Sequence, residues 1–120
     1  MTIFLDTYAI IEIIKGNKNY EKYINIAFRT TIFNLYELYY NLLKDYDEET
    51  AESYFLKYFP SVLDVKKEYI FGASKFRLSN KNSNFSYVDA LGYYISKLEG
   101  YKFLTGDKEF ENLDNVEFVK

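Results

Sequence analysis

The chain contains no cysteine and no histidine among its 120 residues. Without cysteine there is no disulfide framework, no thiolate metal site and no cysteine nucleophile. Without histidine, the sequence excludes a Ser-His-Asp triad, histidine acid–base chemistry and the usual zinc sites. A hydrolytic enzyme with this composition would need another way to generate its nucleophile.

Long hydrophobic runs and a basic leader are also missing. No apolar run approaches the ~18 residues of a membrane-spanning helix. The first charged residue is Asp6, so no basic region of the kind that opens a signal peptide precedes it. We therefore expect a soluble cytoplasmic protein with no membrane partner. The net charge of −3 predicts no broad cationic face, although it leaves a local basic patch possible.

What is present is typical of a globular domain. Hydrophobic residues make up 48% of the chain and charged residues 28%, which excludes wholesale disorder and favours one domain over residues 1–120. Aromatic residues reach 21%, with 14 Tyr and 11 Phe. They could form base-stacking platforms, but core packing in a Tyr- and Lys-rich sequence is the favoured interpretation.

Short apolar runs alternate with longer amphipathic stretches along the chain. The predicted strands are Thr2–Leu5, Arg29–Ile32, Ser61–Val65, Tyr101–Leu104 and Glu117–Val119. The predicted helices are Thr7–Lys15, Tyr20–Ala27, Phe33–Lys44, Glu48–Phe59, Lys66–Leu78 and Ser86–Glu99. Pro60 ends one helix and Gly100 another. This alternation predicts an α/β layer fold with a largely parallel sheet.

Two aspartates follow predicted strands directly. Asp6 comes after Ile3–Leu5, and Asp107 follows the strand that ends near Leu104. Ligands of open parallel sheets bind beyond the carboxyl ends of the strands, so both residues are expected at one edge. Either aspartate alone could instead be a helix N-cap that accepts backbone N–H groups.

Two further acids have competing local interpretations. Asp89 closes Ser86-Tyr87-Val88-Asp89, a spacing typical of a capping box at a helix start. That role and a place at the sheet edge are compatible. Glu37 lies inside a predicted helix on the shoulder of its apolar stripe, where an isolated Glu is usually solvated.

Taken together, the four acids suggest a different chemistry. Convergent carboxylates repel one another unless a cation lies among them. An all-oxygen ligand set suits Mg²⁺ or Mn²⁺. Such an ion lowers the pKa of bound water and stabilises the oxygens of a phosphodiester during displacement.

The segments that carry these acids resemble the PIN-domain family, and within it the VapC-type toxins of prokaryotic toxin–antitoxin pairs. The similar segments are Ile3–Thr7, Thr31–Leu38, Tyr87–Leu91, Phe103–Phe110 and the closing Leu113–Val119. Each motif alone is weak, and Thr105-Gly106-Asp107 with its neighbours is the most specific. Their order and spacing are similar over essentially the whole chain.

The resemblance implies a three-layer sandwich with a central, mostly parallel five-stranded sheet, and a Mg²⁺- or Mn²⁺-dependent endoribonuclease. It implies an acidic quartet that holds the metal and carries catalysis, namely Asp6, Glu37, Asp89 and Asp107. Thr7, Thr105 and Asn34 correspond to supporting polar positions. An RNA substrate, a cognate antitoxin and a homodimer are the implied partners. With only Arg29 and Arg77 as arginines, contacts to RNA would rest on lysine.

Three other interpretations remain open. A receiver-like domain would need a phosphoacceptor after a middle strand, where Asp64 lies, but no acidic pair follows the first strand. A PIN-like domain without catalysis could serve as an RNA- or protein-binding module. A purely structural protein would use the acids only as caps.

Overall fold

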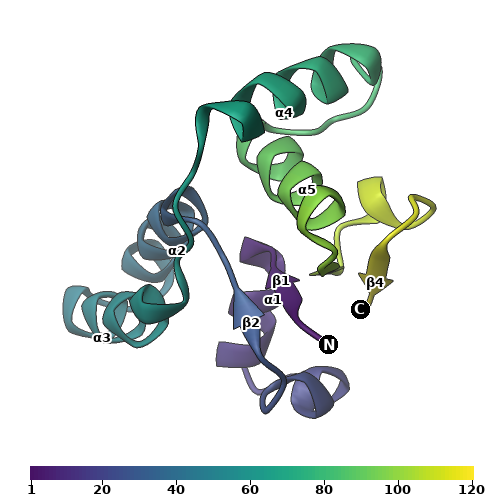
Figure 1. The fold of residues 1–120 in the computed structure, drawn as a ribbon. Helices are drawn as coiled ribbons and strands as arrows, with labels where there is room; N and C mark the ends of the chain where they lie inside the picture. The colour runs from purple at the N-terminus through teal and green to yellow at the C-terminus, as the bar shows by residue number, and fades with distance from the viewer.

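The computed structural model describes residues 1–120 and contains one parallel sheet of four strands. The strands are β1 (Ile3–Leu5), β2 (Phe28–Arg29), β3 (Lys102–Thr105) and β4 (Val116–Phe118). Their order is β2-β1-β3-β4, and every neighbouring pair is parallel. Figure 1 labels three of them, with β1 between β2 and β4. The α/β class with a parallel sheet is as predicted, but the sheet has four strands rather than five.

The predicted strand over Ser61–Val65 is reduced to a single bridge. Val62 pairs only with Thr30, through backbone hydrogen bonds from Thr30 N to Ser61 O at 3.1 Å and from Leu63 N to Thr30 O at 3.0 Å. The next residue, Thr31, is already the N-cap of a helix. The chain therefore leaves the sheet after Thr30, and no edge remains for a longer strand to pair with.

Helices pack against both faces of the sheet. They are α1 (Thr7–Ile14), α2 (Ile32–Asp45), α3 (Glu48–Tyr58), α4 (Lys67–Ser79) and α5 (Tyr87–Glu99). Three 3₁₀ segments, η1 (Lys18–Tyr23), η2 (Phe59–Ser61) and η3 (Lys108–Phe110), lie between them. None of these helices has the length and apolar character required to cross a membrane. Most predicted bounds agree with the structure within one residue.

Two predicted elements in the first half of the chain are wrong. The helix predicted over Tyr20–Ala27 is the 3₁₀ segment η1, which begins after the Asn17 cap. Tyr20 and Tyr23 are both buried, and the three-residue turn of a 3₁₀ helix places such a pair on one face. The strand predicted over Arg29–Ile32 stops at Arg29, because the Thr31 hydroxyl accepts the Asn34 N–H at 3.2 Å and starts α2.

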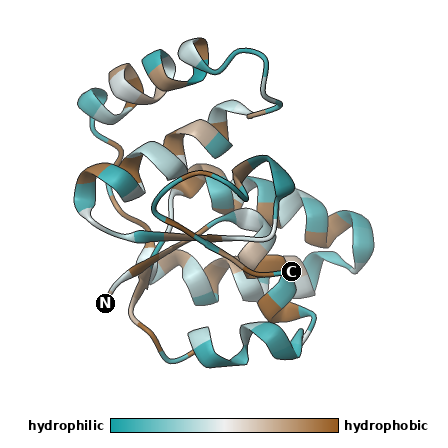
Figure 2. Cartoon of the chain, turned by 90° about the vertical axis from the view of Figure 1, so that its right-hand side faces the viewer, coloured by the Kyte–Doolittle hydropathy of each residue, from teal (hydrophilic) through white to brown (hydrophobic).

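Side chains of alternate residues pack on opposite faces of the sheet. Ile3 and Leu5 belong to a core that includes residues of α1, α2 and α3. Phe4 and Phe103 belong to a second core with residues of α4 and α5, and their rings stack at 5.7 Å. The hydrophobic strands cross between helices that show mixed hydropathy (Figure 2). The result is the three-layer arrangement expected for an α/β sheet.

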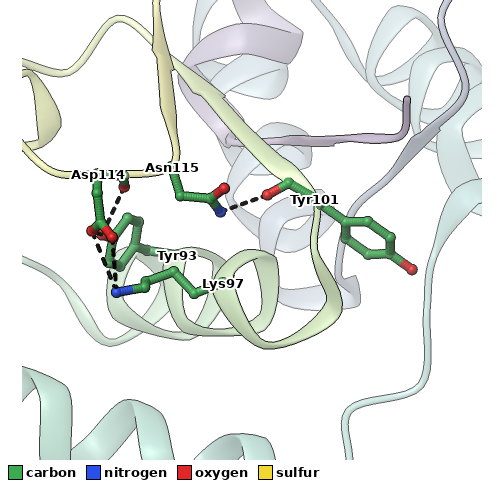
Figure 3. Close-up of polar contacts among 5 residues, drawn as sticks. All are labelled: Tyr93, Lys97, Tyr101, Asp114 and Asn115. Atoms are coloured by element: carbon green, nitrogen blue, oxygen red, sulfur yellow. Dashed lines mark hydrogen bonds and ion pairs between the residues drawn. The ribbon is translucent and has the colours of Figure 1, made fainter.

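A small polar cluster attaches the last strand to α5 (Figure 3). The Tyr93 hydroxyl donates to the Asp114 carboxylate at 2.7 Å, and the Lys97 ammonium lies 3.3 Å from that carboxylate. The Asn115 side chain donates to the Tyr101 carbonyl at 2.6 Å, and Asn115 has a φ of +65°. These contacts define the turn into β4 and so align β4 with β3, whose end carries the Asp107 loop.

Candidate active site at the carboxyl edge of the sheet

Asp6 lies at the end of β1 and caps α1. Its side chain is 3% exposed and accepts two hydrogen bonds, from the Thr7 N–H at 2.9 Å and from the Thr105 hydroxyl at 2.6 Å. Burial raises the pKa of Asp6 to about 7, and the charges of Asp89 and Glu37 add to this rise, although both hydrogen bonds oppose it. Asp6 is therefore an N-cap and, in addition, a strongly perturbed carboxyl group at the sheet edge.

Asp107 lies beyond the end of β3, which is parallel to β1 and paired with it. The Thr105 hydroxyl accepts the Asp107 N–H at 3.1 Å, so Thr105 connects Asp6 to the Asp107 loop. The Asp107 carboxylate accepts the Glu109 N–H at 3.0 Å and starts η3. Gly106 lies between Thr105 and Asp107, and a Cβ at this position would lie 2.5 Å from the Val119 carbonyl oxygen. Only glycine allows the residue that follows β4 to approach the loop this closely.

Glu37 reaches the same edge from α2, at the end of a short hydrogen-bonded chain. The Thr7 hydroxyl donates to Glu37 Oε1 at 2.7 Å. Asn34 donates to the Thr7 hydroxyl at 3.0 Å, and the Thr31 hydroxyl donates to Asn34 Oδ1 at 2.6 Å. Burial is the main cause of a raised Glu37 pKa, and the charge of Asp89 adds to it. Glu37 is half-buried and oriented by Thr7, unlike a freely solvated helix residue.

Asp89 forms the predicted capping box at the start of α5. Its N–H donates to the Ser86 hydroxyl at 3.0 Å, and its carboxylate accepts the Ser86 N–H at 3.0 Å. Burial nevertheless raises the Asp89 pKa, and the nearby charges of Asp107 and Glu109 act in the same direction. The local cap stabilises the carboxylate less than its surroundings destabilise it.

This balance predicts how Asp89 variants behave without metal. In Asp89→Asn the amide oxygen still accepts the Ser86 N–H, while a half-buried charge is removed. We expect the melting temperature in EDTA to be unchanged or higher. Ser86→Ala, which removes one half of the box, is the matched control and should lose about 0.5–2 kcal/mol. A clear drop in the melting temperature of Asp89→Asn would mean that Asp89 acts mainly through its charge at the helix start.

The four acids affect one another without forming a tight cluster. The charges of Asp89 and Glu37 raise the pKa of Asp6, and the charge of Asp107 raises that of Asp89. No three carboxylates are close enough together to hold one metal ion. Repulsion among like charges opposes closer approach when no cation lies between them. The donor set, oxygen only, is of the kind that Mg²⁺ and Mn²⁺ prefer.

Two residues of this site were missed by the sequence interpretation. Thr31 starts α2 and orients Asn34, and the Thr-x-x-Asn spacing before an amphipathic stretch was the available signal. Gly106 was quoted only as part of a motif, although a glycine between two polar residues at a strand end indicates close backbone contact.

The sequence of residues 3–116 matches the PIN domain. The chain belongs to the PIN-domain family. No curated protein is significantly similar in sequence.

Among solved structures, this PIN domain has the fold of a chain in VapBC2 from Rickettsia felis bound to a promoter DNA fragment. The TM-score is 0.74 and the identity 19%, with 99% of this chain and 98% of that chain covered. A chain of DNA-bound VapBC from Salmonella typhimurium has a TM-score of 0.75 and 19% identity, with 99% of this chain and 98% of that chain covered. Mycobacterium tuberculosis VapC20 is described as a sarcin–ricin loop cleaving toxin. It has a TM-score of 0.73 and 13% identity, with 91% of each chain covered.

Proposed function

We propose that this PIN domain is a metal-dependent endoribonuclease and the toxin of a VapBC-type toxin–antitoxin pair. The observation that carries the proposal is Asp6, a buried carboxyl group whose pKa is raised to about 7 beside other acids. A perturbed acid at the carboxyl edge of a parallel sheet is a candidate functional group. The fold is also that of VapC20, which is described as a sarcin–ricin loop cleaving toxin.

The proposed cofactor is Mg²⁺ or Mn²⁺. Asp6, Asp89 and Asp107 would be its ligands, with Glu37 completing the set, and the cation would have to draw these separated carboxylates together. Such an ion supplies an activated water and stabilises negative charge on a phosphodiester. The remaining roles belong to this chain's own polar groups. Thr105 orients Asp6 through its 2.6 Å hydrogen bond. Thr7, itself held by Asn34, orients Glu37.

The proposed partners are an RNA substrate, a cognate antitoxin and a second copy of the chain. The antitoxin is supported by neighbours that were solved as VapBC complexes. Exposed aromatic side chains on α2, such as Tyr36 at 74% and Tyr40 at 62%, are available for protein contacts. Action in the cytoplasm is part of the same proposal.

A PIN domain that binds RNA or protein without cleaving it is the second candidate. The separation of the carboxylates is the observation that favours it. The two candidates differ in whether adding a divalent cation produces cleavage.

A cleavage assay on a structured RNA tests the proposal directly. Purified protein is titrated with Mg²⁺ and Mn²⁺, with Ca²⁺ and excess EDTA as the comparison conditions. We expect cleavage with Mg²⁺ or Mn²⁺, poor cleavage with Ca²⁺, which prefers longer bonds and more ligands, and none in EDTA. The rate should rise toward alkaline pH, because the water activated by the cation would ionise more fully there and no histidine is present to titrate near neutral pH. Robust cleavage in EDTA that survives loss of every acid would contradict the mechanism.

A further inference from the structure

A small apolar pocket lies between α4, α5 and the first turn of α2. Its volume is about 180 Å³, and its lining includes Phe33, Ile70, Arg77, Tyr87 and Leu91. Pockets for complete small-molecule ligands usually measure ~300–1,000 Å³. This pocket is therefore suited to one ring of a larger molecule rather than to a whole cofactor.

Two aromatic rings at this pocket are exposed to solvent. Tyr87 is 76% exposed and Phe33 is 42% exposed. An exposed ring offers a face on which another planar group can stack, at ~1–3 kcal/mol for a nucleobase. The core interpretation of the aromatic residues, which holds for Phe4 and Phe103, does not account for Tyr87 and Phe33.

Arg77 gives the pocket a defined polar wall. Its guanidinium carbon lies 4.1 Å from the centre of the Tyr87 ring, and its Nε donates to the Phe85 carbonyl at 2.9 Å. None of the ion pairs in the structure involves Arg77. The side chain is thus held in place without a carboxylate partner, so its positive charge is available to an anion such as a phosphate.

The pocket adjoins the candidate active site through α2. Phe33 and Glu37 are four residues apart in α2, a spacing that makes their side chains neighbours on one helix face. Tyr87 and Asp89 share the first turn of α5, but at a two-residue spacing their side chains point to different sides of that helix. A polymer whose phosphate lies at the acids would therefore have its next unit within reach of the pocket.

We propose that this pocket, here called the stacking pocket, receives one unpaired nucleobase of the RNA next to the cleaved phosphate. The base stacks on the face of the Tyr87 ring that Arg77 does not cover, Phe33 contributes the opposite apolar wall, and Arg77 faces a neighbouring phosphate. The inference rests on the proposed nuclease function. It adds that the substrate must be single-stranded beside the cleavage site, since a paired base cannot enter.

A binding cycle in a cleavage-deficient background tests the stacking pocket. Asp6→Asn protein is titrated with a fluorescent single-stranded RNA and with the same RNA carrying one abasic position, moved along the strand. Adding Tyr87→Ala should weaken binding of the intact RNA by roughly 5- to 150-fold, given ~1–3 kcal/mol per stacked base. When the abasic position coincides with the base that enters the pocket, Tyr87→Ala should no longer weaken binding, because the Tyr87 ring then has no base to stack on.

Matched variants separate stacking from general damage. Tyr87→Phe keeps the ring and should bind like its parent. Tyr46→Ala removes another exposed tyrosine, one that does not line the pocket, and should not change binding. Arg77→Gln should reduce the dependence of log affinity on log salt by about 0.7, the contribution of one phosphate contact on a single strand.

The outcomes distinguish this inference from the nuclease proposal. If wild-type protein cleaves RNA but Tyr87→Ala binds intact RNA as tightly as its parent, the stacking pocket is wrong and the nuclease stands. If sedimentation shows that Tyr87→Ala changes self-association and RNA affinity is unchanged, the surface is a protein interface and the inference is overturned. If wild-type protein cleaves no RNA with any metal, the nuclease proposal itself fails.

Discussion

Asp6→Asn should lower RNA cleavage more than ~100-fold while leaving the protein folded and more stable without metal. The expected loss exceeds the ~10–100-fold typical of residues that only orient a metal ligand. Asn is as good an N-cap as Asp, so the bond to the Thr7 N–H is kept. A neutral amide, however, is a weaker ligand for a divalent cation and removes the negative charge at the sheet edge.

Thr105→Val is the matched comparison for this prediction. Valine has nearly the shape of threonine, but it cannot donate to Asp6 or accept from Asp107, as Thr105 does. We expect an intermediate loss of cleavage, within ~10–100-fold, and a loss of stability from the unpaired buried groups. If Asp6→Asn retained near-normal cleavage with Mg²⁺, the assignment of Asp6 to the metal would be wrong.

The stability of the metal-free protein should fall as the pH rises from about 4 to about 7. The Asp6 pKa is 3.8 in its ordinary state and about 7 in the fold. Between these values the folded protein keeps a proton that the unfolded chain releases, so raising the pH favours unfolding. A shift of this size corresponds to about 4 kcal/mol when complete, above pH 7. Glu37 and Asp89 shift in the same direction.

Thermal unfolding in EDTA at pH 4.5 and pH 8 measures this effect. The wild-type melting temperature should fall relative to that of Asp6→Asn by on the order of 10 °C. Adding Mg²⁺ at pH 8 should raise the wild-type value more than the variant value, because the ionised carboxylate gains a cation. Parallel pH profiles for the two proteins would show that Asp6 has an ordinary pKa in the fold.

The sequence was sufficient to predict the strand-end acids, because a short apolar run followed by Asp is a local pattern. Asp6 and Asp107 follow parallel neighbouring strands, and the capping box of Asp89 could be read from four residues. The environment of Glu37 could not be predicted in this way. It depends on Thr7, which is 30 residues away in the chain, and on how far α1 and α2 approach each other.

The missing fifth strand has a similar explanation. The segment Ser61–Val65 has the composition of a strand, but a strand also needs a partner edge of matching length. That edge ends at Thr30, since Thr31 starts α2. Side-chain capping of the next helix therefore decided the extent of the sheet, and this competition between two local signals is not visible in hydrophobic pattern alone.

Three of the four acids are held by the backbone of the turn in which they occur. Asp6 accepts the Thr7 N–H, Asp89 the Ser86 N–H and Asp107 the Glu109 N–H. Each carboxylate is thus aimed by the backbone of its own turn, and only Asp6 also accepts a hydrogen bond from a distant side chain, that of Thr105. Substitutions in the remote core should accordingly weaken the fold without turning these groups, so the site can tolerate extensive sequence drift elsewhere in the chain.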